Sequence, residues 1–263
     1  MSRNRYVTTS FISSRERPVR KLSAYDRFAL SLLIIFVVVF VALGIDPWFR
    51  SDWLLENLIV FFAVPALILL HRHMPLSKVS YSVIFIFLCL HEVGAHYTYA
   101  LVPYDQWFET LTGRGLNERL GWDRNHYDRL IHFFYGLLIT YPMREIVMRV
   151  SRVQGFWSYL LPVLVVISTS TIFELLEWAA VLIFGGDLGV AYLGTQGDVW
   201  DAQKDMLLAA IGSMLTTLIV LSVNYTLDRN FTRDWIESLR VKRRKPLGEV
   251  AVAELLAKKR HEE

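Results

Sequence analysis

Three aspartates stand at the start of a long apolar run in the last third of the chain. The segment reads QGDVWDAQKD, and its acids are Asp198, Asp201 and Asp205. Asp201 and Asp205 are four residues apart, so they share one face of a helix. Carboxylates in a membrane-spanning helix are costly, and they are expected to face other helices and to bind ions or carry protons. The segment therefore indicates a polar site inside a membrane protein.

Acids and histidines recur at helical spacing in three further apolar runs. Each pair is three or four residues apart and so forms one stripe on its helix. At a rise of about 1.5 Å per residue, all four stripes fall in the outer half of the predicted membrane layer. We therefore expect them to share one pocket. The three further pairs are Glu92 with His96, Asp128 with His132, and Glu174 with Glu177.

The charge of the expected pocket indicates a divalent cation. Its carboxylates outnumber Arg129 and Lys204, and like charges cannot all stay ionised in a low-dielectric site. Mixed imidazole and carboxylate ligands suit zinc, manganese or iron, and an all-oxygen subset suits magnesium or calcium. The predicted metal ligands are Glu92, His96, His132, Glu174, Glu177, Asp201 and Asp205, and the predicted catalytic residues are Glu174, Asp128 and His132.

Each of these elements also has a purely structural interpretation. Asp198 could cap the helix that follows it. Asp128 and His132 could form a pair that ties two helices together, and the glutamates of FELLEW could bond to neighbouring tyrosines or tryptophans. His91 points away from the Glu92 stripe, so we interpret it as a hydrogen-bonded core residue.

Six apolar runs must position the polar residues. Hydrophobic residues make up 54% of the 263 residues, and the mean hydropathy is +0.35. Each run is close to the length of about 20 residues that a membrane-spanning helix needs. The sequence therefore predicts an all-α polytopic membrane protein, a bundle of about six transmembrane helices. The expected spans are 28–45, 54–71, 79–101, 126–149, 157–184 and 203–226.

The distribution of lysine and arginine predicts the orientation. Most of the 28 basic residues lie in the two tails and in the connections on one side. The positive-inside rule then places both termini in the cytoplasm. The basic tails suit topology signals and anionic membrane lipids, not nucleic acid. We expect a cytoplasmic N-terminal tail over 1–26, a transmembrane domain over 27–226 and a basic cytoplasmic C-terminal tail over 227–263.

The longest connection, residues 102–125, lies on the predicted outer side and carries three arginines against the positive-inside bias. They could pair with acids of the same loop. They could also bind an anionic group such as a lipid phosphate while the loop gates entry to the site. The predicted substrate-binding residues are Arg114, Arg119 and Arg124.

Five motifs in order, HEVGAHYTY, NHYDRLIHFFYG, PMRE, FELLEW and QGDVWDAQKDM, resemble the YjdF family of bacterial inner-membrane proteins, a domain of unknown function. The resemblance covers about residues 25–225. It implies the fold and the membrane location but no established reaction. A looser similarity, through Asp128, His132 and Phe133, is to VanZ-like proteins, which are linked to glycopeptide resistance and the cell envelope. The chain departs from that pattern by adding HEVGAH and pairing Glu174 with Glu177.

Three functions follow from these patterns. The first is a metal-dependent membrane-embedded enzyme that acts on a lipid or lipid-linked envelope substrate at the outer leaflet. The second is a proton-coupled transporter, since acid and histidine chains also relay protons. The third is a structural or accessory membrane protein whose polar layer serves only helix packing.

Overall fold

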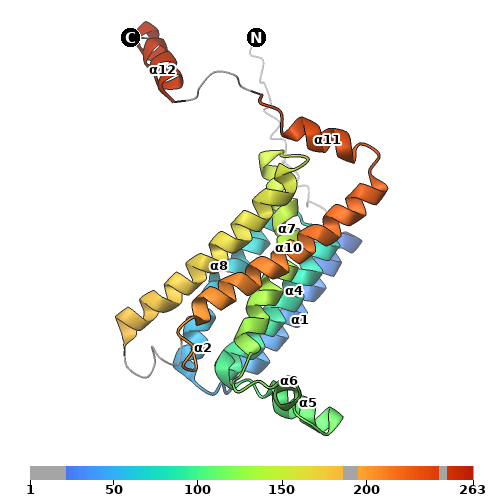
Figure 1. The fold of residues 1–263 in the computed structure, drawn as a ribbon, viewed down its shortest axis with the longest axis vertical. Coiled ribbons are helices and arrows are strands. Elements are labelled where there is room, and N and C mark those ends of the chain that lie inside the picture. Colours follow the sequence, from blue (N-terminus) through green and yellow to red (C-terminus); the bar gives the residue numbers. More distant parts are fainter. Residues whose placement is uncertain (1–21, 186–194, 243–247, 263) are drawn as a thin grey trace, which may run out of the picture.

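A computed structural model describes residues 22–185, 195–242 and 248–262 of the protein, and within these ranges it contains helices and no strand. Figure 1 shows the bundle, with the connecting helices at its two ends. The long helices are α1 (Ala24–Gly44), α3 (Leu58–His73), α4 (Lys78–Tyr97), α7 (Tyr127–Ser151), α8 (Trp157–Phe184) and α10 (Asp201–Leu227). The short ones are α2 (Arg50–Glu56), η1 (Tyr99–Leu101), α5 (Tyr104–Thr112), α6 (Leu116–Leu120), α11 (Phe231–Ser238) and α12 (Glu249–Glu262).

The helices have the length and composition of a multi-pass membrane protein. Five segments of the described chain are long and apolar enough to cross a membrane: α1, α2 with α3, α4, α8 and α10. The remaining long helix, α7, has 25 residues but carries charged side chains at both ends. It packs against α4, α8 and α10, in the centre of the bundle (Figure 1). The prediction of an all-α polytopic membrane protein is confirmed.

Two of the predicted spans are not single helices. The span expected at 54–71 is divided at Asn57, whose side-chain amide donates to the carbonyl oxygen of Trp53 at 2.9 Å and so competes with the backbone. The span expected at 79–101 ends as an α-helix at Tyr97. Thr98 then takes a left-handed conformation (φ 58°), and the chain turns into η1. These breaks bring α2 and η1 to the bundle end that holds the polar residues.

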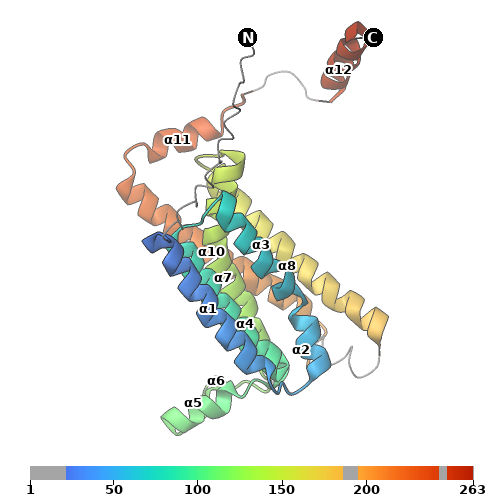
Figure 2. The ribbon, with the colours of Figure 1, turned by 180° about the vertical axis from the view of Figure 1, so that it is seen from behind.

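Two of the long helices, α1 and α4, begin with side-chain caps. Ser23 accepts from the backbone N–H of Asp26 at 3.0 Å, and the Asp26 carboxylate accepts from the backbone N–H of Ser23, which is a capping box at the start of α1. Ser77 accepts from the backbone N–H of Ser80 at the start of α4. Figure 2 shows that α1 begins at the same end of the bundle at which α10 finishes. The predicted N-terminal tail lies, up to residue 21, outside the described residues.

The closest helix contact joins α7 and α10 through two glycines. A Cβ at Gly136 would lie 1.9 Å from the carbonyl oxygen of Ala209, and a Cβ at Gly212 would lie 2.2 Å from that of Phe133. Small residues at such a crossing let two backbones touch inside a membrane. The contact is reinforced by a hydrogen bond of 2.7 Å between the hydroxyls of Thr140 and Ser213. It therefore fixes the distance between the side chains that α7 and α10 carry one and two turns closer to the bundle end that holds the polar residues.

Candidate functional site

Three side chains from α7 and α10 converge next to this glycine contact. Asp128, His132 and Asp205 each offer one ligand atom, and the three atoms lie within 4.8 Å of one another. His132 and Asp205 are buried, and the Asp128 side chain is 15% exposed. Such a group of one imidazole and two carboxylates is close enough to surround a single ion. Asp205 lies 77 residues beyond Asp128 in the chain, and the packing of α10 against α7 brings the two together.

Two glutamates of α8 border this group. Glu174 Oε1 lies 3.2 Å from His132 Nε2, and Asp128 Oδ1 lies 3.7 Å from the same nitrogen. Glu177, one turn further along α8, is buried and lines the same cavity as Asp128 and His132. The predicted meeting of the α7, α8 and α10 stripes is thus found in the structure.

Three buried acids of this layer form no ion pair with a lysine or arginine of the described chain. Among the described residues, no lysine or arginine forms an ion pair with Glu174, Glu177 or Asp205. Within the same residues, Glu174 Oε1 and Asp205 Oδ1 have no hydrogen-bond partner. A buried uncompensated carboxylate is costly, so protons or a cation must neutralise this layer. One imidazole with two carboxylates fits zinc, manganese or iron(II) by ligand type.

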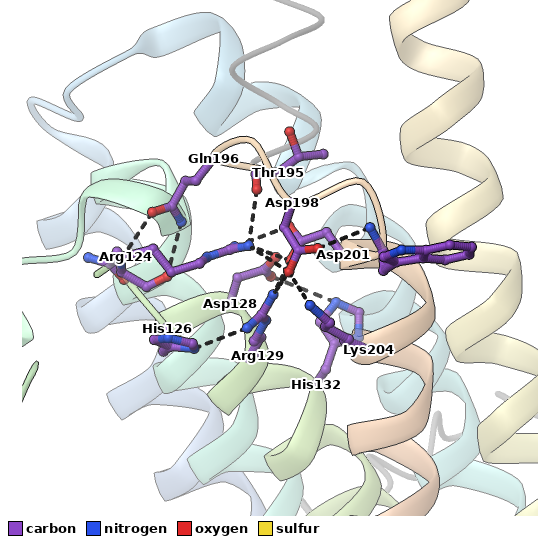
Figure 3. Close-up of polar contacts among 12 residues, drawn as sticks. Arg124, His126, Asp128, Arg129, His132, Thr195, Gln196, Asp198, Asp201 and Lys204 are labelled. Atoms are coloured by element: carbon purple, nitrogen blue, oxygen red, sulfur yellow. Dashed lines mark hydrogen bonds and ion pairs between the residues drawn. The ribbon is translucent and has the colours of Figure 1, made fainter. Parts of the chain in front are cut away.

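A second layer, closer to the end of the bundle, is fully ion-paired (Figure 3). Arg124 holds Asp201 through two hydrogen bonds of 2.7 and 3.1 Å, and Arg129 Nη2 lies 2.9 Å from Asp201 Oδ1. Arg129 also pairs with Asp198, and Lys204 Nζ lies 2.5 Å from Asp198 Oδ2. Two aspartates therefore meet three cations. This layer joins the loop before α7 to the turn before α10.

The ion pairs shift the pKa values of the groups that lie outside the helices. The Lys204 ammonium, the Trp200 backbone N–H and the Arg129 guanidinium hold the pKa of Asp198 well below its ordinary value. Partial burial, and then the nearby charges of Arg129 and Arg124, lower the pKa of His126. Asp198 therefore stays ionised at neutral pH, and His126 is neutral there.

Two predicted ligands, Glu92 and His96, lie outside this group. His96 Nδ1 donates to the carbonyl oxygen of Leu43 on α1 at 2.7 Å. Glu92 is fully buried, and neither of its carboxylate oxygens has a hydrogen-bond partner among the described residues. The expectation that all four stripes share one pocket is corrected here. Matching depth did not bring the α4 stripe into the group, because depth does not fix the direction in which a helix face points.

The remaining predicted residues are held by ion pairs or hydrogen bonds. Asp201, a predicted metal ligand, uses both carboxylate oxygens for arginines. Arg114 pairs with Glu118 at 2.9 Å, and Arg119 donates to the Thr112 carbonyl at 3.3 Å; both are exposed. They belong to the loop of α5 and α6, which extends beyond the end of the bundle (Figures 1 and 2). Of the three predicted substrate-binding arginines, the structure places only Arg124 at the site.

One buried acid near the site was not predicted. Glu56 of α2 is 5% exposed, lies close enough to Asp128 to experience its charge, and its Oε2 has no hydrogen-bond partner among the described residues. Glu56 lies four residues after Asp52, so the two acids share a helix face, and this spacing could have predicted a further polar stripe. The interpretation of His91 as a hydrogen-bonded core residue is confirmed, since its Nδ1 lies 2.5 Å from the hydroxyl of Tyr99 and its side chain is buried.

Comparison with known proteins places the chain among membrane proteins without an assigned reaction. Residues 28–225 match the family described as "Predicted membrane protein (DUF2238)". The chain is 38% identical over 195 residues to the inner membrane protein YjdF of Escherichia coli (strain K12), covering 74% of this chain and 87% of that protein. No solved structure matches it.

Proposed function

The chain belongs to the DUF2238 family of predicted membrane proteins, and we propose that it is a metal-dependent membrane-embedded enzyme whose site lies in the outer half of the bilayer. The observation that carries this proposal is the grouping of Asp128, His132 and Asp205, whose ligand atoms lie within 4.8 Å of one another. The substrate we propose is a lipid or a lipid-linked envelope molecule. In the orientation that places this site in the outer half of the bilayer, both termini lie in the cytoplasm.

Asp128, His132 and Asp205 would hold the ion. Three protein ligands leave a coordination position open, which is the arrangement of catalytic rather than structural metal sites. When bound, a divalent cation supplies Lewis-acid activation of an oxygen at that position. Asp128 and His132 also line the cavity between the helices, so a molecule held in that cavity would lie beside them.

Glu174 is the residue we assign to proton transfer. It lies 3.2 Å from His132 Nε2 and is not itself part of the ligand group. A carboxyl this close to a proposed ligand can exchange a proton with a group bound next to it. Glu177 lies on the same stripe of α8 as Glu174. It would be protonated too, so that the acidic layer carries less uncompensated negative charge.

The ion-paired layer of Arg124, Arg129, Asp198, Asp201 and Lys204 would close the site toward the outer aqueous side. Its bonds connect residues 69 to 77 positions apart, so it fixes the connection before α10 to the start of α7. Substrate would then reach the acidic layer from the membrane, between the helices.

The transporter alternative has less support, because the inner half of the bundle centre is mostly apolar. Beyond Tyr135, toward the C-terminal end of α7, this helix contributes Ile139, Pro142, Met143 and Ile146 to the cavity wall. A proton or ion path would need polar groups there. Proton flux in proteoliposomes that is abolished in Asp205→Asn would favour transport over catalysis.

Elemental analysis of the purified protein tests the metal. After exposure to zinc, manganese and iron(II), we expect close to stoichiometric metal in the wild type and loss of it in Asp205→Asn and His132→Ala. Glu92→Gln is the matched control, because it also neutralises a buried acid in a membrane helix but lies outside the ligand group. Wild-type protein without stoichiometric metal, or equal loss in Glu92→Gln, would overturn the metal site.

A further inference from the structure

A cavity of about 550 Å³ opens between α3, α4, α7 and α8, on the side of α7 away from α10. Its polar end is formed by Asp128, His132 and Glu177. From Asp128 it follows α7 as far as Ile146, 18 residues further, which corresponds to about 27 Å of helix. This length is close to the hydrocarbon thickness of a bilayer, about 30 Å.

The walls beyond the polar end offer few groups to a polar ligand. They are formed mainly by aliphatic side chains, such as Ala63 and Ala66 of α3 and Ile139 of α7. The hydroxyls of Tyr135 and Thr169 bond to each other at 2.5 Å, and the Ser170 hydroxyl also lines the wall, with no hydrogen-bond partner among the described residues. A molecule that fits this shape is apolar along most of its length and polar at one end.

The wall formed by α3 is a single helix whose other side is exposed to the surrounding lipid. Phe62 and Leu69 of this helix are 71% and 57% exposed. A second cavity, of about 390 Å³ between α1, α3 and α4, shares Leu67 and Leu88 with the first, so α3 has open space on both flanks. Pro65 within α3 also lacks the N–H that a regular helix would use. A chain can therefore enter sideways from the bilayer past α3.

We infer that the cavity between α3 and α7 binds the hydrocarbon chain of a membrane lipid, with the polar group of that lipid at Asp128 and His132. The inference deepens the proposed function. It rests on that proposal only in assuming that the polar group of the lipid reacts at the metal group. It assigns the substrate class: a lipid whose chain is held inside the protein, parallel to α7, while its head reaches the acidic layer.

Photo-crosslinking in vesicles tests this site. The full-length protein is reconstituted into phosphatidylethanolamine and phosphatidylglycerol vesicles that contain a trace of phosphatidylglycerol with a diazirine at the end of one acyl chain. After illumination and digestion, the labelled peptides are identified by mass spectrometry. In the wild type we expect the label on the α7 wall of the cavity, around Ile139 and Met143.

Two variants should block the cavity from opposite walls. Ala66→Trp and Ile139→Trp should reduce the cavity label several-fold. Leu69→Trp is the matched control, since it adds an indole to the same helix at a position that lines neither cavity, and it should leave the label unchanged. If both blocking variants fail to fold, the wild-type label distribution decides by itself.

The outcomes separate this inference from the proposed function. Label spread evenly over lipid-facing positions such as Phe62 would overturn the chain site, whatever the metal content. Wild-type protein without label on the α7 wall would overturn it as well. A chain site in a protein without metal would support the inference while removing the proposed enzyme.

Discussion

Replacing Gly136 by alanine tests whether the contact of α7 with α10 sets the geometry of the site. The added Cβ would lie 1.9 Å from the carbonyl oxygen of Ala209 and 2.8 Å from the backbone nitrogen of Ser213. Both neighbours are backbone atoms, so no side-chain rotation can relieve the overlap. The helices must separate by at least the 1.1 Å between 1.9 Å and the 3.0 Å minimum that real Cβ contacts observe.

The cost follows from two opposing effects. Overpacking a tightly packed interior costs about 1–3 kcal/mol, whereas alanine gains about 1 kcal/mol over glycine in helix propensity. We therefore expect the free energy of unfolding to fall by up to about 2 kcal/mol. Because Asp128 and His132 move with α7 while Asp205 moves with α10, metal affinity should also fall, by about tenfold for each 1.4 kcal/mol lost.

Unfolding in mixed detergent micelles and chelator competition for bound metal measure the two effects. Gly248→Ala is the control, because a Cβ there meets no atom within 4 Å. Gly136→Ala with wild-type unfolding and wild-type metal affinity would refute the reasoning, since the helices could then not be in backbone contact next to the site.

Four further predictions concern the ion-paired layer and the metal. Arg124→Gln should lower the free energy of unfolding by about 1.5–3 kcal/mol, because it removes two charge-assisted hydrogen bonds from the buried Asp201 carboxylate; the exposed Arg119→Gln should change it by about 0–1 kcal/mol, and equal effects would contradict the buried pairing. The lowered pKa of His126 means that the unfolded state binds its proton more readily, so stability should fall as pH drops below the ordinary value of 6.5, and less so in His126→Gln. The pKa of Asp198 is also lowered in the folded state, so the stabilisation by its carboxylate should be complete above pH 3.8 and be lost on further acidification. In Asp198→Asn the melting temperature should therefore depend less on pH in that acid range. Zinc at about 100 times its dissociation constant should stabilise metal-free wild type by about 2.7 kcal/mol and leave Asp205→Asn unchanged, and equal stabilisation of both would argue against Asp205 as a ligand.

The sequence was sufficient for the helices, because hydropathy and length set membrane spans independently of what surrounds them. The predicted span 157–184 coincides with α8, and α7 and α10 end within two residues of the predicted bounds. Helical spacing also identified the stripes on these helices, because residues four apart must share a face. The hydropathy pattern did not predict breaks within a span, such as the one at Asn57, where a side-chain hydrogen bond accompanies the division of one apolar run into two helices.

Only the tertiary structure decided which stripes meet. The pattern on α4 looked like the pattern on α7, yet His96 bonds to α1 whereas His132 lies beside Glu174. Periodicity fixes the residues of a face and leaves open the neighbour that the face contacts. That choice is made by packing over long sequence separations: the contact of Gly136 with α10 brings Asp205 to Asp128, and Arg124 reaches Asp201 across 77 residues.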